Sequence, residues 1–160
     1  MAPTTPYSKD LGDREPIASI HDAIGRIQSL AARWSPADYE RSYAPGKWTA
    51  RQLLIHLAQA ELALGTRARM ALTTPGYQAQ AFNQDAWIAR ESSLSGADAL
   101  AAFAALGRMN AVLFASLSEA DRQTTLTHPE YGPLTVDWII YMIAGHQLHH
   151  IPHFEQITRS

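Results

Sequence analysis

The chain has 160 residues, of which 46% are hydrophobic and 18% charged, and its formal net charge is −2. This composition is typical of one folded domain with a hydrophobic core and excludes a disordered chain. The basic residues are scattered, so no positive stripe exists that would bind nucleic acid. The apolar runs are shorter than the ~20 residues of a membrane-spanning helix, and the amino terminus lacks the pattern of a secretory signal. We therefore expect a cytoplasmic protein whose partners include neither nucleic acid nor a membrane.

The sequence contains no cysteine and seven histidines. The lack of thiols excludes disulfides, iron–sulfur clusters and a cysteine nucleophile. A metal site in this chain can use only nitrogen and oxygen ligands, so the histidines are the first candidates for ligands.

Four long helices are predicted along the chain. Residues 1–15 show no periodicity and are expected to form a flexible or surface-hugging lead, followed by one domain over residues 16–160. Apolar residues at helical spacing predict the first helix from Pro16 to Trp34. Capping-box patterns and a capping threonine predict the other three, over residues 49–72, 95–117 and 136–158.

The connections are longer than usual and carry short elements of their own. Short helical turns are predicted after Ser35 and Ser118, a short helix over 82–90, and an extended segment that can form a small hairpin over 124–134. This pattern indicates an all-α fold, a four-helix bundle with short extra helices in long connections. Connections of this length can run along the whole bundle, so a simple up-down order is not assured.

Four histidines share one face of the last long helix. At 100° per residue, His146, His149, His150 and His153 fall within an arc of roughly 100°. The pairs His146/His150 and His149/His153 are each four residues apart, so either pair can grip one metal ion. The spacing alone does not choose between the two pairs.

His56 supplies a third candidate ligand from the second long helix. It lies among leucines and isoleucines on the side that faces inward, although a single inward histidine is more often a hydrogen-bonded core residue. Two ligands from one helix and one from a facing helix are how bundles build metal sites in their cores. Three neutral imidazoles leave a fourth position for water or substrate, which is the catalytic pattern.

Several segments together resemble one protein family. Residues 46–58 read GKWTARQLLIHLA, which is similar to the W-[ST]-x-[RK]-[QE]-x-x-x-H-L signature of DinB/YfiT-like proteins. The pattern H-x-x-H-H-x-x-H over 146–153 resembles the YfiT branch, metal-dependent hydrolases that include bacillithiol S-transferases. Arg67, Trp87 and the block HPEYG over 128–132 resemble the intervening blocks of that branch in the same order.

The resemblance implies a four-helix bundle of the DinB/YfiT type with an up-up-down-down-like order, often a homodimer. It also implies a divalent transition metal, most commonly zinc or nickel with iron as a further option, held by three histidines. Transferred residue by residue, those ligands are His56, His146 and His150. His149 and His153 then become candidates for catalytic or pocket residues beside the metal.

Two positions depart from the family pattern. Relatives often have Asp or Asn three residues after the first ligand, where this chain has Gln59, so the outer partner of His56 is expected to differ. Pro152 lies inside the last helix, where it removes an amide and clashes with the carbonyl of Leu148. We therefore expect the helix to kink or end there, which puts the positions of His153 and Glu155 in question.

The expected activity follows from the open coordination position. A metal-bound water gives hydrolysis of a small-molecule substrate, and a low-molecular-weight thiol as co-substrate gives S-transfer. If Glu61 or Glu155 replaced one histidine, the site would be a two-histidine, one-carboxylate triad. The non-enzymatic alternative is a metal-bound dimeric stress or binding module, which a fourth protein ligand such as His149 would favour.

Other polar and aromatic residues are also candidates for the pocket. Arg67 can instead pair with Glu61 or Asp85, Trp87 fits a core position, and Tyr141 is rotated away from the His146 face. The full set of pocket candidates comprises His149, His153, Glu61, Arg67, Trp87 and Tyr141.

Overall fold

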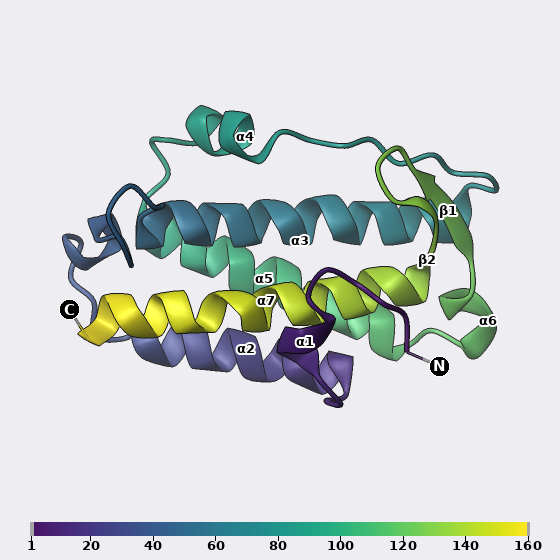
Figure 1. Ribbon diagram of the computed structural model, residues 1–160, viewed down its shortest axis with the longest axis horizontal. Helices are drawn as coiled ribbons and strands as arrows, with labels where there is room; N and C mark the ends of the chain where they lie inside the picture. The colour runs from purple at the N-terminus through teal and green to yellow at the C-terminus, as the bar shows by residue number, and fades with distance from the viewer. Residues whose placement is uncertain (1, 160) are drawn as a thin grey trace.

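Four long helices packed lengthwise form the body of the protein in the computed structural model, which describes residues 2–159 (Figure 1). They are α2 (Pro16–Ala31), α3 (Ala50–Thr73), α5 (Gly96–Ala115) and α7 (Val136–Arg159). The shorter elements are α1 (Ser8–Leu11), the 3-10 turn η1 (Asp38–Glu40), α4 (Gln84–Arg90), α6 (Glu119–Arg122), β1 (Thr125–His128) and β2 (Gly132–Thr135). The predicted all-α four-helix bundle with short extra helices is confirmed.

The helices begin where their capping residues predict. Thr49 Oγ1 accepts a hydrogen bond from the Gln52 amide at 3.2 Å, and Gln52 Oε1 accepts from the Thr49 amide at 2.9 Å. This reciprocal pair satisfies two amides that the first turn of α3 would otherwise leave unpaired. Ser95 caps α5 in a similar way by accepting from the Asp98 amide. Local sequence therefore sets the start of each of these helices.

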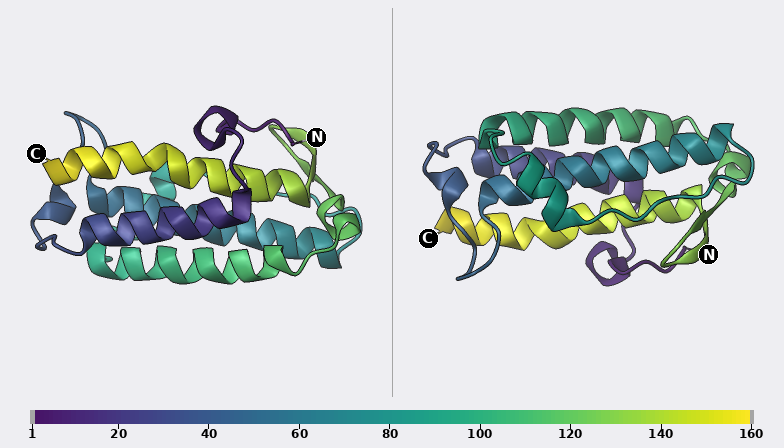
Figure 2. Two further views of the ribbon diagram at one scale, coloured as in Figure 1. Left: turned by 90° about the horizontal axis from the view of Figure 1, so that it is seen from below. Right: turned by 90° about the horizontal axis from the view of Figure 1, so that it is seen from above.

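The direction of the helices differs from the up-up-down-down order that the resemblance implied. Figures 1 and 2 show α2 and α7 running one way and α3 and α5 the other, an up-down-down-up order. The ion pair between Arg26 and Glu155, at 2.7 Å, joins the later halves of α2 and α7. Because α3 and α5 are parallel neighbours, the connection over 74–95 must return along the bundle, and α4 lies within it.

Small residues allow α3 and α5 to pack closely. A Cβ at Gly65 would overlap the side chain of Asn110, so only glycine fits there. α5 is also long and apolar enough to cross a membrane by length and hydropathy, alone among the helices of residues 2–159. That property does not assign it to a membrane, because α5 packs against α2 and α3 in the bundle.

The chain before Pro16 lies against α7. The Trp138 indole donates to the Thr4 carbonyl at 2.9 Å, and α1 contacts α7 through the buried side chain of Leu11. A Cβ at Gly145 would come within 2.7 Å of the Tyr7 carbonyl oxygen, so glycine lets the lead approach the helix. This contact places Tyr7 beside the histidine face of α7.

α7 continues through Pro152 instead of ending there. Phe154 and Ile157, in the turns after the proline, are fully buried, and Glu155 pairs with Arg26. These contacts hold the last turns in place although Pro152 donates no hydrogen bond to the Leu148 carbonyl. Tertiary packing therefore overrides the local preference of proline, and of the two expected outcomes, a kink or an end, the end at Pro152 is wrong.

A small two-stranded sheet lies beside the C-terminal end of α3 (Figure 1). β1 and β2 form the antiparallel hairpin that the sequence allowed, with Leu126 opposite Leu134. The segment after α3 adds to this hairpin, because the Ala79 amide donates to the Thr127 carbonyl at 2.8 Å. The connection over 77–82 and the hairpin tip over 128–131 are thereby tied together.

Candidate metal centre

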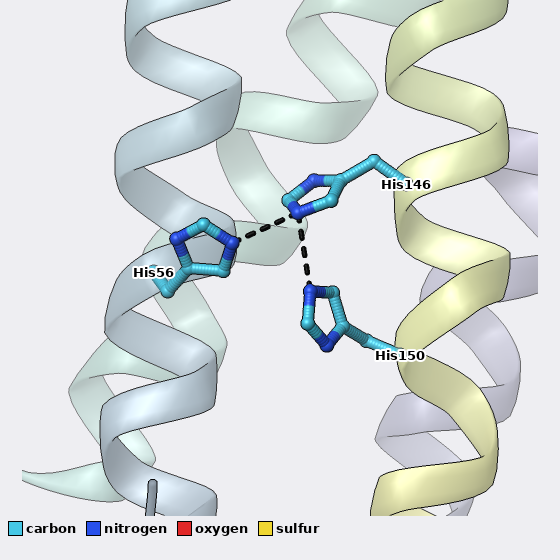
Figure 3. Close-up of side chains that lie close together, drawn as sticks. All are labelled: His56, His146 and His150. Carbon is cyan, nitrogen blue, oxygen red and sulfur yellow. Dashed lines mark hydrogen bonds between the residues drawn. The ribbon is translucent and has the colours of Figure 1, made fainter. Parts of the chain in front are cut away.

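Three buried histidines meet between α3 and α7 (Figure 3). The Nε2 atom of His56 lies 2.8 Å from that of His146, which lies 3.1 Å from that of His150. Each residue offers one ring nitrogen such that all three nitrogens lie within 4.8 Å of one another. Side chains 90 residues apart in sequence therefore converge on one point, with one ligand candidate from α3 and two from α7.

Burial keeps these three imidazoles neutral at physiological pH. Loss of hydration lowers the pKa of His56 to about 4 and that of His150 to about 2. The pKa of His146 is also well below its usual value, first because of burial and then because of the neighbouring imidazoles. A neutral imidazole keeps a lone pair on one nitrogen, which is the form that binds a metal.

The arrangement fits a divalent metal ion. His146 Nε2 lies within hydrogen-bonding distance of two other Nε2 atoms. Because a neutral imidazole nitrogen carries either one proton or one lone pair, it cannot form a well-directed hydrogen bond to both. A tetrahedral ion with Zn–N bonds of about 2.0–2.1 Å separates its nitrogen ligands by about 3.3 Å. The separations of 2.8 Å and 3.1 Å are close to that value, and all three nitrogens lie within 4.8 Å of one another, so side-chain rotations would accommodate an ion.

His153 supports His150 from the outer side. The Nδ1 atoms of His150 and His153 are 3.1 Å apart, so a proton on His150 Nδ1 can be donated to His153 and leave Nε2 free as a ligand. The His153 ring is stacked on Tyr43 with centroids 4.1 Å apart. His153 is thus held in place beside the cluster despite the neighbouring Pro152.

His56 lacks a comparable outer partner. Its Nδ1 is buried and has no hydrogen-bond partner within residues 2–159. Gln59, at the position where the resemblance leads us to expect Asp or Asn, donates to Glu91 at 2.9 Å. The Trp48 ring packs on the His56 ring at 5.0 Å. On the Nδ1 side, aromatic packing rather than a hydrogen bond therefore orients this imidazole.

His149 lies outside the cluster. Its Nδ1 is 3.4 Å from an Asp10 carboxylate oxygen, its side chain is 41% exposed, and its ring packs on Tyr7. The i, i+4 pair that faces His56 is therefore His146/His150, the pair chosen by the resemblance. A fourth protein ligand would favour a closed, structural metal site. His149 does not provide such a ligand in the described arrangement.

Neither candidate carboxylate approaches the three histidines. Glu61 is buried on the other side of α3, where it accepts hydrogen bonds from Asn110 at 2.8 Å and from Gln147 at 2.6 Å. Burial raises the pKa of its carboxyl to about 7. Glu155 is engaged with Arg26. The geometry therefore gives no two-histidine, one-carboxylate triad.

A pocket opens beside the histidines, and we call it the histidine pocket. Two of the three histidines, His56 and His146, line it. The other lining residues include Tyr7 of the lead, Arg67 of α3, Phe82 of the 77–82 connection and His128 of the hairpin tip. His149 and His153 do not line it. A ligand in this pocket would contact the metal ligands from the side that the bundle leaves open.

Sequence reasoning missed two residues of this pocket as functional candidates. Tyr7 belongs to the lead, which has no periodicity, and its ring lies 5.1 Å from that of His146. Burial raises the pKa of Tyr7. His128 was noted only within the HPEYG block, whose place over the pocket depends on the pairing of the hairpin with the 77–82 connection. No local signal marks either residue.

The other pocket candidates have different outcomes. Arg67 lines the pocket and pairs with neither Glu61 nor Asp85. Trp87 is 37% exposed and packs on Phe82, so the expectation of a core position is wrong. Tyr141 packs against the hydrophobic core and does not line the histidine pocket, as its rotation from His146 predicted.

Comparison with known proteins agrees with this arrangement. A protein of Oceanobacillus iheyensis named "Putative metal-dependent hydrolase" is 27% identical over 144 residues, which is 89% of this chain and 84% of that protein. A protein of the same name from Bacillus mycoides is 27% identical over 142 residues, covering 88% of this chain and 82% of the relative. Both relatives are matched over most of their length.

A solved structure shares the fold. The structure described as "YfiT from Bacillus subtilis is a probable metal-dependent hydrolase with an unusual four-helix bundle topology" matches with a TM-score of 0.82. The match has 20% sequence identity and covers 99% of this chain and 90% of that one. The sequence model of the DinB superfamily matches residues 19–153, which include all three histidines of the cluster. The chain therefore belongs to the DinB superfamily.

Proposed function

We propose that this protein is a metal-dependent enzyme in which His56, His146 and His150 hold one divalent transition metal, zinc or nickel. The observation that carries the proposal is the convergence of three neutral imidazoles beside a pocket that two of them line. A purely structural site would need a fourth protein ligand. Of the two further histidines on that face, His149 is directed to Asp10, and His153 faces the outer nitrogen of His150.

The chemistry would be activation of a small nucleophile. When bound, an ion of this kind lowers the pKa of a coordinated water to about 7 or deprotonates a coordinated thiol. The chain itself supplies the neutral nitrogen donors and an aromatic surround, with Trp48 against His56 and Tyr7 against His146. These rings limit access of bulk water and strengthen electrostatic interactions within the site.

Two reactions fit this arrangement. In hydrolysis, a water oxygen attacks the substrate and the leaving group departs with a proton. In thiol transfer, the sulfur of a low-molecular-weight thiol forms a bond to a carbon of the substrate as the leaving group departs, and the thiol proton passes to solvent. The names of the relatives favour the first reaction, whereas the open three-histidine site is compatible with both.

The experiment compares both reactions on zinc-loaded and nickel-loaded protein. Hydrolysis is followed with p-nitrophenyl acetate, and thiol transfer with 1-chloro-2,4-dinitrobenzene and cysteine. We expect metal-dependent turnover in one assay that is lost in His56→Ala and retained in His21→Ala, which alters an exposed histidine of α2. Equal rates for loaded wild type, His56→Ala and metal-depleted protein in both assays would contradict an enzymatic role of this kind.

A further inference from the structure

Arg67 lies on the same face of α3 as His56. Eleven residues separate the two, which corresponds to a rotation of about 20° and a rise of about 16 Å along the helix. Helical side chains lean toward the N-terminal end of their helix, so the Arg67 side chain is directed back toward His56. Both residues line the histidine pocket, with Ala60 and Leu64 between them. The pocket therefore has His56 toward one end and a cation toward the other.

The guanidinium of Arg67 has no anionic partner in the described part of the chain. It donates a hydrogen bond to the Gln80 carbonyl and lies 5.8 Å from the centre of the Phe82 ring. No carboxylate oxygen of residues 2–159 comes within 4.0 Å of it. Burial lowers its pKa, which expresses the cost of holding this charge partly out of water. A half-buried cation that forms no ion pair is suited to an anionic ligand.

His128 adds a second donor to the same pocket. The Glu130 amide donates to His128 Nδ1 at 3.2 Å, so in the neutral ring the proton must be on Nε2. Burial and the nearby Arg67 lower the pKa of His128, which keeps the ring neutral. The side chain is only 3% exposed and lines the pocket. Arg67 and His128 thus both offer hydrogen-bond donors, and neither offers an acceptor.

We propose that Arg67 and His128 form an anion subsite that binds the carboxylate of a small organic substrate whose reacting group lies at the three histidines. The inference rests on the proposed function, because it assigns the far end of the same pocket. One guanidinium charge and one neutral imidazole match a monoanion better than a phosphate dianion. Leu64, Met142 and Phe82 give the pocket an apolar wall, so the substrate carries a hydrophobic or aromatic middle.

Glu130 limits how strongly the subsite attracts an anion. Its exposed carboxylate also lines the pocket, and it lies beyond ion-pair distance of Arg67. A negative charge at this position repels a bound carboxylate. Glu130→Gln is therefore expected to strengthen binding of an acid and to leave binding of the matched neutral amide unchanged.

The test measures binding of matched acids and amides by isothermal titration calorimetry. The probes are phenylacetate, 3-phenylpropionate and 4-phenylbutyrate, the three corresponding amides, and inorganic phosphate. For at least one chain length, wild type is expected to bind the acid about 10-fold more tightly than the amide, since charge-assisted hydrogen bonds are stronger than neutral ones. Arg67→Gln is expected to lose this preference, and Arg67→Lys to keep part of it.

Controls separate this subsite from the metal centre. Each titration is repeated on chelator-treated protein, because a carboxylate can also bind a metal directly. A preference that persists without metal and disappears in Arg67→Gln assigns the anion to Arg67, whatever the fate of the metal proposal. Arg108→Gln, at an exposed position of α5 away from the pocket, is expected to behave as wild type.

Three outcomes of the acid and amide titrations would overturn the inference. They are the absence of acid binding to wild type at millimolar concentration, equal affinity for acids and amides, and an unchanged preference in Arg67→Gln. Tighter binding of phosphate than of every carboxylate would also overturn it, because the subsite would then select a different anion. Circular dichroism of each variant shows that a loss of binding is not a loss of the fold.

Discussion

His56 Nε2 and His146 Nε2 lie 2.8 Å apart although 90 residues separate them in the chain. The contact joins the first half of α3 to the middle of α7, two helices that run in opposite directions. Two bare imidazole lone pairs at this distance repel one another unless a proton or a metal ion lies between them. The relationship of these two residues is therefore the point on which the metal proposal depends.

His153 is expected to tune metal affinity through His150. His153→Phe keeps a ring against Tyr43 and removes the nitrogen that faces His150 Nδ1. Loss of such an outer partner lowers metal affinity by about 10–100-fold. Competition with a chelator of known affinity measures the change. His21→Phe, at an exposed site, serves as the control, and an affinity for metal unchanged by His153→Phe would show that His153 does not support the ligand.

Glu61 is expected to make stability depend on pH. Burial raises its pKa from 4.5 to about 7, so the folded state binds more protons than the unfolded state between these values. The stabilising effect of the neutral carboxyl is present below pH 4.5 and is lost as the pH rises through about 7. Ionising this buried group costs about 3 kcal/mol of folding free energy.

The variant Glu61→Gln isolates this effect. An amide mimics the neutral acid, since it can accept from Asn110 and donate to the unpaired Gln147 oxygen after that amide turns over. Urea unfolding from pH 5 to pH 8 should show the variant gaining up to about 3 kcal/mol relative to wild type. Wild type and Glu61→Gln contain the same histidines. Subtracting their unfolding free energies at each pH therefore cancels the contribution of histidine titration. A difference that stays constant with pH would show that Glu61 is not neutralised by burial.

Pro152 is expected to be a tolerated defect in α7. The residue is exposed, so replacing it does not disturb the core, and an alanine there restores a hydrogen bond to the Leu148 carbonyl. Pro152→Ala should therefore raise the free energy of unfolding by about 1–3 kcal/mol. Chemical denaturation measures this change. Gln156→Ala, at an exposed site one turn later, should change stability by less than about 0.5 kcal/mol. A less stable Pro152→Ala protein would mean that the proline serves the local geometry.

The helices and their starting residues could be predicted because their signals are local. Thr49 with Gln52 and Ser95 with Asp98 form the capping contacts that the sequence pattern indicates. The direction of α5 could not be predicted, because it depends on contacts with α3 rather than on its own sequence. Gly65 shows this dependence, because glycine at this position of α3 leaves room for the side chain of Asn110 on α5.

The candidate site divides in the same way. The spacing of His146 and His150 within one helix is a local signal. The family resemblance indicated that His56 belongs to the same set of ligands. Tyr7 and His128 were missed because only the folded chain brings the lead and the hairpin to this pocket. The helix was predicted over 136–158, but an end at Pro152 was expected as one outcome and does not occur, because burial of Phe154 outweighs the break that proline favours.

Metal content shows whether His56 and His150 belong to one metal site. Untagged wild type, His56→Ala, His150→Ala and the control His21→Ala are purified without chelator, incubated with zinc or nickel, desalted, and examined by elemental analysis. We expect about one ion per chain in wild type and His21→Ala, and a loss of that ion in both site variants. Wild type that retains no metal, or metal that is retained equally after His56→Ala, would contradict a site shared by α3 and α7.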